Sequence, residues 1–109
     1  MVYNEQLARR IREILAELPG LVEKKMFGGI GFLVRGNMAC GVHGNTLIVR
    51  VGRTQYAEAL AKPYARPSDM TGRPMEGWVA VDSGGYASDD ALRDWVQEAV
   101  SFALTLPPK

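Results

Sequence analysis

The sequence predicts an α+β domain in which an antiparallel β-meander is flanked by an N-terminal and a C-terminal helix. Apolar residues recur at three- and four-residue spacing near both ends of the chain, which is the pattern of amphipathic helices. Between them lies a stretch rich in β-branched and aromatic residues, divided by glycine-containing turns, which is the pattern of a meander. The chain has 109 residues, the length of one domain, so residues 1–109 are expected to fold as a single unit.

The first predicted element is an amphipathic helix that begins after Asn4 and ends before Pro19-Gly20. Asn4 has the side chain of an N-cap residue, and a Pro-Gly pair does not continue a helix. Its apolar positions are Leu7, Ala8, Ile11, Ile14, Leu15 and Leu18. Its outer face, which is expected to face solvent, carries Glu5, Arg9, Arg12, Glu13 and Glu17.

Four strands are predicted in the meander, at about residues 22–27, 30–35, 38–43 and 46–51. Gly36-Asn37 and Gly44-Asn45 would each form a two-residue hairpin turn. Residues then pair directly across each turn, which places Leu33 opposite Cys40 and Cys40 opposite Val49. We expect these three residues to be buried and no helix to occur between residues 30 and 50.

Side chains alternate between the two faces of a strand, so this pairing predicts the composition of each sheet face. The better core face would carry Leu33, Arg35, Met38, Cys40, Val42, Leu47, Val49 and Val51. The second face would carry Ile30, Phe32, Val34, Ala39, Gly41, His43, Thr46, Ile48 and Arg50. Small residues at the centre of the second face would let a helix or a second subunit approach closely. This face is therefore expected to be either a thin second layer or an interface.

The segment after the meander begins with a short helix and is then irregular. Thr54 is expected to cap the helix, which runs to Leu60 and is ended by Pro63. Residues 62–77 hold three prolines and two glycines without periodicity, and irregular segments of this length are usually functional or mobile. Residues 78–81 follow as a short apolar strand.

A loop is expected at residues 82–85, and the last helix follows it. Ser88 is a strong N-cap, and Asp89 and Asp90 place negative charge at the positive end of the helix dipole. Pro107-Pro108 ends the helix. Its apolar face consists of Leu92, Trp95, Val96, Ala99, Phe102, Ala103 and Leu106.

Composition and charge exclude several classes of function. Thirteen Lys and Arg residues stand against twelve Asp and Glu residues, a formal net charge of +1. A dedicated nucleic-acid-binding protein has a strong basic excess, so no direct specific binding to nucleic acid is expected. The single cysteine cannot form an internal disulfide, and the charged start is unlike a signal peptide. No run approaches the roughly 18 apolar residues of a membrane span. A cytoplasmic protein without a membrane partner is therefore expected.

The motifs that suggest chemistry are weak. Gly28-Gly29 precedes a strand, whereas phosphate-binding fingerprints need a helix after the glycines, so a bend between strands is expected. Cys40 and His43 have metal-like spacing, but three residues apart in a strand places them on opposite faces. Cys40 is therefore expected to be a core residue rather than a reactive thiol, and His43 lacks a nucleophile and an orienting carboxylate. We expect no metal, no cofactor and no catalytic residue.

One set of residues is a candidate binding site for an anion or a partner. It combines cations with aromatic residues on the first strand and around the irregular segment. The alternative is that these are scattered solubilising charges and aromatic core residues. The candidates are Lys24, Lys25, Phe27, Arg66, Arg73 and Trp78.

Several of these stretches together resemble the N-terminal domain of the TfoX/Sxy competence regulators. The likeness spans most of the chain and rests on Lys25-Met26-Phe27-Gly28-Gly29, the apolar hairpin ending at Gly41-Val42, residues 47–51, and Gly72-Arg73-Pro74-Met75 leading into Trp78. The resemblance implies an antiparallel sheet flanked by helices, akin to secretion-chaperone-like folds. It also implies a bacterial cytoplasmic setting and a link to the regulation of DNA-uptake genes. The family supplies no established catalytic residue.

Two main functional hypotheses follow. The first is a non-enzymatic regulatory or protein-interaction domain that uses a sheet face or residues 62–77, with a protein partner and a possible weak homodimer through a sheet face. The second is a small-ligand binding module with a pocket near Phe27, Arg73 and Trp78. An enzyme and a direct DNA-binding protein are the remaining alternatives.

Overall fold

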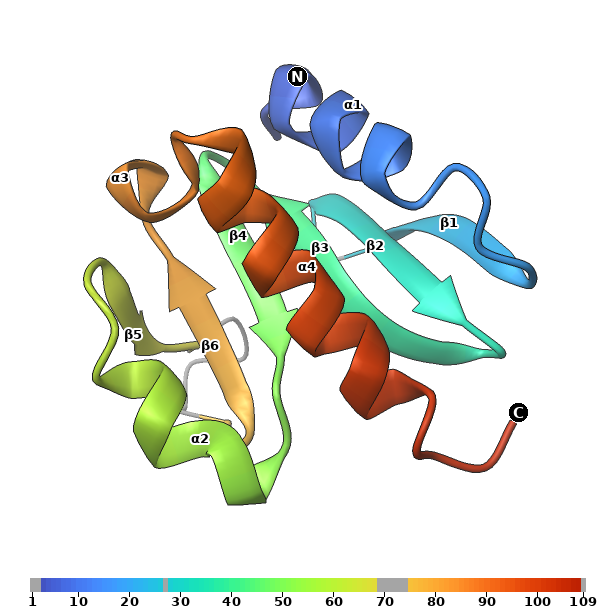
Figure 1. Cartoon of the computed structure of the whole chain (residues 1–109). Coiled ribbons are helices and arrows are strands. Elements are labelled where there is room, and N and C mark those ends of the chain that lie inside the picture. Colours follow the sequence, from blue (N-terminus) through green and yellow to red (C-terminus); the bar gives the residue numbers. More distant parts are fainter. Residues whose placement is uncertain (1–2, 27, 69–74, 109) are drawn as a thin grey trace.

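The computed structural model describes residues 3–26, 28–68 and 75–108, and it shows one sheet and four helices in that part of the chain (Figure 1). In chain order the elements are α1 (Glu5–Ile14), β1 (Leu21–Met26), β2 (Gly29–Val34), β3 (Asn37–His43), β4 (Thr46–Arg50), α2 (Arg53–Leu60), β5 (Ala65–Pro67), β6 (Trp78–Val81), α3 (Ser83–Tyr86) and α4 (Asp89–Ala103).

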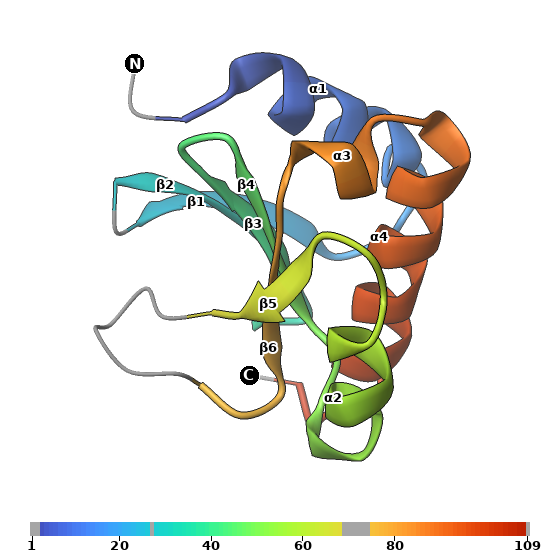
Figure 2. The ribbon, with the colours of Figure 1, turned by 90° about the vertical axis from the view of Figure 1, so that its left-hand side faces the viewer.

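The strands form a single antiparallel sheet in the order β1-β2-β3-β4-β6-β5. The helices gather on one side of this sheet, with α4 lying diagonally across β3 and β4 (Figures 1 and 2). The predicted α+β class, an antiparallel sheet with helices at the two ends of the chain, is confirmed. Among the described helices, none is long and apolar enough to cross a membrane.

The core lies between the sheet and the helices α1 and α4. Each fully buried Leu, Val or Phe side chain contributes about 1.5–3 kcal/mol relative to an exposed one, so this layer dominates the stability of the fold. From the helices it receives Leu7, Ala8, Ile11, Leu92, Trp95, Val96, Ala99 and Ala103. From the strands it receives Ile30, Phe32, Val34, Ala39, Cys40, Val42, Leu47, Val49, Val79 and Val81.

Both long helices begin as the sequence predicts. The Asn4 side chain accepts a hydrogen bond from the Leu7 backbone N–H (3.0 Å), and Ser88 accepts one from Ala91 (3.1 Å). Such N-caps each contribute about 1 kcal/mol. The helix α1 is shorter than expected: it ends at Ile14 and does not continue towards Pro19.

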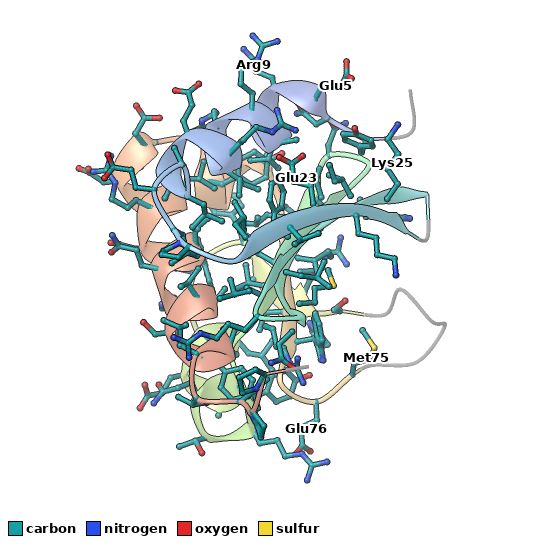
Figure 3. All side chains as sticks on the ribbon, turned by 90° about the vertical axis from the view of Figure 1, so that its right-hand side faces the viewer. Glu5, Arg9, Glu23, Lys25, Met75 and Glu76 are labelled. Carbon is teal, nitrogen blue, oxygen red and sulfur yellow. The ribbon has the colours of Figure 1, made fainter. Side chains whose placement is uncertain are left out.

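A bidentate ion pair connects α1 to the first strand, β1. Arg12 donates to the two carboxylate oxygens of Glu23 at 2.6 and 2.7 Å. These hydrogen bonds lower the pKa of the Glu23 carboxyl. Figure 3 shows Glu23 on the side of β1 that faces α1. Because both groups are partly exposed, the pair fixes the position of the edge strand more than it adds stability.

The predicted pairing of β2 with β3 is wrong by one residue. The turn is Arg35-Gly36, with φ values of 53° and 85°, so Val34 pairs with Asn37. Ala39 is then an extra, bulged residue, and Cys40 lies opposite Phe32 instead of Leu33. Positive φ at both turn residues is typical of a type I′ hairpin, whose twist matches that of the strands.

The shifted register exchanges the two faces of β2. Ile30, Phe32 and Val34, predicted for the second face, are buried in the core, while Leu33 is only half-buried on the other face. Met38 likewise moves to the face away from the helices, as the partner of Leu33. The Gly44-Asn45 turn and the pairing of Cys40 with Val49 are confirmed. So is the burial of both residues.

Three further expectations for the second half of the chain are corrected. The helix α2 starts at Arg53 after Gly52, so Thr54 is not its cap. The segment 62–77, expected to be irregular, contains the edge strand β5, whose three residues pair with β6. The expected loop at 82–85 contains the short helix α3. For β5 and α3, pairing or packing with β6 and α4 supplies order that the local pattern does not show.

The turn residue Arg35 provides a test of this register. An arginine at positive φ carries a cost of about 1–2 kcal/mol, and Asn-Gly is a preferred type I′ pair. The substitution Arg35→Asn should therefore raise the free energy of unfolding by roughly 0.5–1 kcal/mol in urea denaturation. Arg35→Lys keeps the charge and the backbone strain, so it should leave the free energy of unfolding unchanged. A destabilised Arg35→Asn variant would contradict the observed turn.

The core cysteine gives the protein a defined response to alkaline pH. Burial raises the pKa of the Cys40 thiol from 9.0 to about 12. The thiol's contribution to stability is therefore complete below about pH 9, where the unfolded thiol is still protonated, and is lost as the pH rises towards 12. Cys40→Ala should remove this part of the pH dependence and cost about 1–2 kcal/mol at neutral pH. Denaturation of both proteins between these pH values measures the difference, and identical pH profiles would contradict the burial.

Candidate functional site

The sequence-predicted binding residues do not form one cluster. Lys24 and Lys25 lie on β1 and Arg66 lies on β5, and these strands are the two edges of the sheet. Five strand spacings separate them, roughly 24 Å at about 4.8 Å each. Phe27 and Arg73 lie outside the described residues.

The two lysines also point in different directions. Lys24 pairs with Gly31 and faces away from the helices, whereas Lys25 pairs with Ile30 on the helix side. Figure 3 shows Lys25 on the same side of the strand as Glu23. Only Lys24 therefore shares a sheet face with Arg66 and Trp78, which lie on the side away from the helices.

We call the side of the sheet away from the helices the open face, and its strand residues form two main rows. The first row is mostly apolar: Val22, Leu33, Met38, Arg50 and Trp78. The second row has small or apolar residues in the middle and a cation at each end: Lys24, Gly31, Gly41, Ile48, Ala80 and Arg66.

The apolar row is partly accessible. Val22 is 56% exposed, and Leu33, Met38 and Trp78 are half-buried. A Cβ atom built on Gly41 would lie 2.9 Å from the Met38 methyl carbon, so this methyl group occupies the space over the glycine. Methionine is unbranched and adaptable, which makes this part of the surface able to adjust to a bound group.

Arg50 belongs to this surface but is not among the sequence-predicted binding residues. Its guanidinium lies 5.1 Å from the centroid of the Trp78 ring and 5.5 Å from that of Phe102. One of its terminal nitrogens donates a long hydrogen bond (3.5 Å) to the Met38 carbonyl. Partial burial lowers the pKa of the guanidinium. Two aromatic rings thus hold a planar cation at the end of the sheet, with hydrogen-bond donors left for an anionic group.

The charged strand residues of the open face are all cations. Among the strand residues that the structure describes there, Lys24, Arg50 and Arg66 are cations and none is an acid. Arg66 forms an exposed ion pair with Asp82, at the end of β6 (3.2 Å). Most acids instead lie on the helices: Glu5, Glu13, Glu58, Asp89, Asp90, Asp94 and Glu98.

Cys40 and His43 do not combine into a reactive or metal-binding pair. Cys40 is fully buried on the helix side, while His43 is exposed. Their positions in β3 place them on opposite faces. Within residues 3–26, 28–68 and 75–108, no group of three His, Cys, Asp or Glu side chains could hold a metal ion.

A hollow on the helix side of the molecule is not among the sequence-predicted sites. It has a volume of about 380 Å³ and lies between the turn after α2, the helix α3 and the start of α4. The signal that could have indicated it is Pro63-Tyr64, a turn in which tyrosine takes the position that favours glycine.

The fold and the open face define the class of the molecule: an α+β domain built on a one-sided antiparallel sheet. Comparison with protein-family models matches residues 13–103, nearly the whole chain, to the TfoX N-terminal domain. The chain therefore belongs to the TfoX N-terminal domain family, as the resemblance predicts. A search among curated proteins gave no match to this sequence.

The stacking of Arg50 can be tested by removing its charge and its planarity. A half-buried cation–π contact contributes about 1 kcal/mol, so Arg50→Met should lower the free energy of unfolding by roughly that amount. Arg53→Met is a matched control, because the Arg53 side chain is 84% exposed and, among the residues that the structure describes, pairs only with the exposed Glu76. It should change stability by less than about 0.5 kcal/mol. Equal effects of the two variants in urea denaturation would show that the stacking contributes nothing.

Proposed function

We propose that this chain is a non-enzymatic, cytoplasmic regulatory domain that binds a protein partner through its open face. The observation that carries the proposal is the composition of that face: a partly exposed apolar row beside cations, with no acid among the described strand residues. The partner segment that complements it is apolar and acidic. Membership of the TfoX N-terminal domain family supports a role related to competence regulation.

The residue types of the open face support protein binding. Tryptophan, methionine and arginine are enriched in protein interfaces, and tryptophan and arginine dominate their binding energy. Here Trp78, Met38 and Arg50 lie side by side across β3, β4 and β6. The two rings next to Arg50 reduce the side-chain motion that binding would otherwise have to restrict.

The properties of the titratable groups support a non-catalytic role. A nucleophilic cysteine needs a lowered pKa, whereas that of the Cys40 thiol is raised to about 12. The exposed His43 is in no ion pair within the described part of the chain, and no carboxylate shares its strand face. These groups are arranged for packing and surface contact rather than for proton transfer.

The arrangement of cations argues against DNA as the partner. A protein that follows a duplex neutralises about six to ten phosphates. The described strands of the open face carry three cations, and two of these lie at opposite edges of the sheet. On α4, Arg93 lies between Asp90 and Asp94, so this helix has no one-signed face for a groove.

Site-specific photocrosslinking in the source cells tests the proposal. A benzoylphenylalanine at Val22, which is exposed on the open face, should crosslink to one major protein that mass spectrometry can identify. The same probe at Arg9, on the outer face of α1, should not (Figure 3). The affinity of the identified protein is then measured with purified components by calorimetry.

Charge reversal distinguishes the open face from other surfaces. The double variant Lys24→Glu, Arg66→Glu should weaken binding of the identified protein by at least about tenfold, because it opposes the acids of the partner. Arg9→Glu, with the same type of change on the outer face of α1, should leave the affinity unchanged. Equal crosslinking at Val22 and Arg9, or equal affinities of the variants, would overturn the proposal. So would crosslinking of Val22 only to a second copy of the chain or to nucleic acid.

A further inference from the structure

The hollow on the helix side has the dimensions of a binding site. Its volume of about 380 Å³ falls within the usual range of about 300–1,000 Å³ for small-molecule sites. Most of its lining is apolar. The residues around it are Lys62, Pro63, Tyr64, Gly84, Gly85, Ala91, Asp94 and Trp95. The elements that line it, α3, the start of α4 and the turn after α2, lie on the opposite side of the sheet from the open face (Figure 2).

One wall is a tyrosine held in an unfavourable conformation. The Ala65 backbone N–H donates to the Lys62 carbonyl (3.3 Å), so residues 62–65 form a turn with Pro63 and Tyr64 at its centre. Tyr64 has a φ of 67°, where type II turns favour glycine. Tyr64 is also 59% exposed. Neither the conformation nor the exposure of this ring favours folding, and such local costs often mark functional positions.

The next wall is shaped to fit that tyrosine. A Cβ atom on Gly84 would lie 2.4 Å from the Tyr64 ring, and one on Gly85 would lie 3.1 Å from the Tyr64 Cβ. Both glycines belong to the short helix α3, and glycine within a helix costs about 1 kcal/mol relative to alanine. The missing side chain of Gly84 thus leaves the space in which the exposed ring lies, whereas that of Gly85 makes room first for the Val81 side chain (2.5 Å) and then for the Tyr64 Cβ.

The floor contains a tryptophan whose face already receives a cation. The Lys62 ammonium lies 4.5 Å from the centroid of the Trp95 ring and pairs with Glu98 at 3.1 Å. Lys62 and Glu98 therefore neutralise each other. Asp94, also at the edge of the hollow, is exposed and forms no ion pair with the residues that the structure describes. The net charge at the mouth is negative.

We propose that this hollow binds a compact cationic aromatic group, an arylalkylamine. The aromatic ring lies in the apolar hollow against Tyr64 and beside the Lys62 side chain, whose ammonium lies over the Trp95 ring. The ammonium lies at the mouth, where it donates hydrogen bonds to the Asp94 carboxylate. A free amine and the N-terminal residue of a peptide that begins with phenylalanine both present this chemistry.

Titration with phenethylamine, followed by NMR chemical shifts, tests the site. Saturable shifts should appear at the Trp95 indole N–H and at the backbone amides of Gly84 and Gly85. Hydrocinnamate has the same ring with a carboxylate in place of the amine, and it should bind at least about tenfold more weakly because it opposes Asp94. A peptide amide of sequence Phe-Gly-Gly distinguishes the sources: tighter binding than phenethylamine identifies a protein N-terminus, and equal or weaker binding a free amine.

Three variants link binding to the named groups. Asp94→Asn should weaken phenethylamine binding about tenfold, the loss expected for a charge-assisted hydrogen bond. Asp90→Asn, on the same helix but outside the hollow, should not. Tyr64→Asn should abolish the shifts while the protein becomes more stable to urea, because asparagine tolerates positive φ. That gain in stability excludes unfolding as the cause.

Three outcomes would overturn this proposal: no saturable shift at millimolar phenethylamine, equal binding of hydrocinnamate, or unchanged binding by Asp94→Asn. None of them bears on the open face, whose crosslinks and charge-reversal variants involve other residues.

Discussion

The pairing of β2 with β3 is the constraint on which the rest of the structure depends. A shift of one residue in a strand exchanges its two faces. The Arg35-Gly36 turn and the bulge at Ala39 together determine which face of β2 each residue occupies. They direct Ile30 and Phe32 towards α4. Without the bulge, β2 would expose its largest apolar side chains. The core under the helices and the composition of the open face therefore have the same origin.

The sequence predicts those parts of the fold that depend on local chemistry. Asn4 and Ser88 cap their helices, and the apolar strand 78–81 appears with the expected bounds, because each signal lies within a few residues. The predicted turn at Gly36-Asn37 is one residue later than the observed one, since Gly36 fits either of two turns and only packing of Phe32 decides between them. The strand β5 has no local pattern at all, and its order comes from pairing with β6.

The same distinction applies to the two candidate sites. Trp78 and Arg66 could be selected from residue type alone, but Arg50 acquires its role from rings contributed by β6 and by the last turn of α4. The hollow beside Tyr64 joins residues more than twenty positions apart in the sequence, so its volume follows only from the packing of α3 against α4. Binding surfaces assembled across elements are thus the part of a molecule that a single sequence describes least.

The edges of the sheet determine whether a strand of another chain can pair with it. The outer strand β1 carries the consecutive charges Glu23, Lys24 and Lys25, and the opposite edge, β5, has three residues and ends in Pro67. Charges and proline on short outer strands discourage the addition of a further strand from another chain. Pairing of a further strand with the backbone of β1 or of β5 is therefore disfavoured. The recognition proposed for the open face therefore depends on its side chains, whose shape and charge would select a partner, rather than on an extension of the sheet.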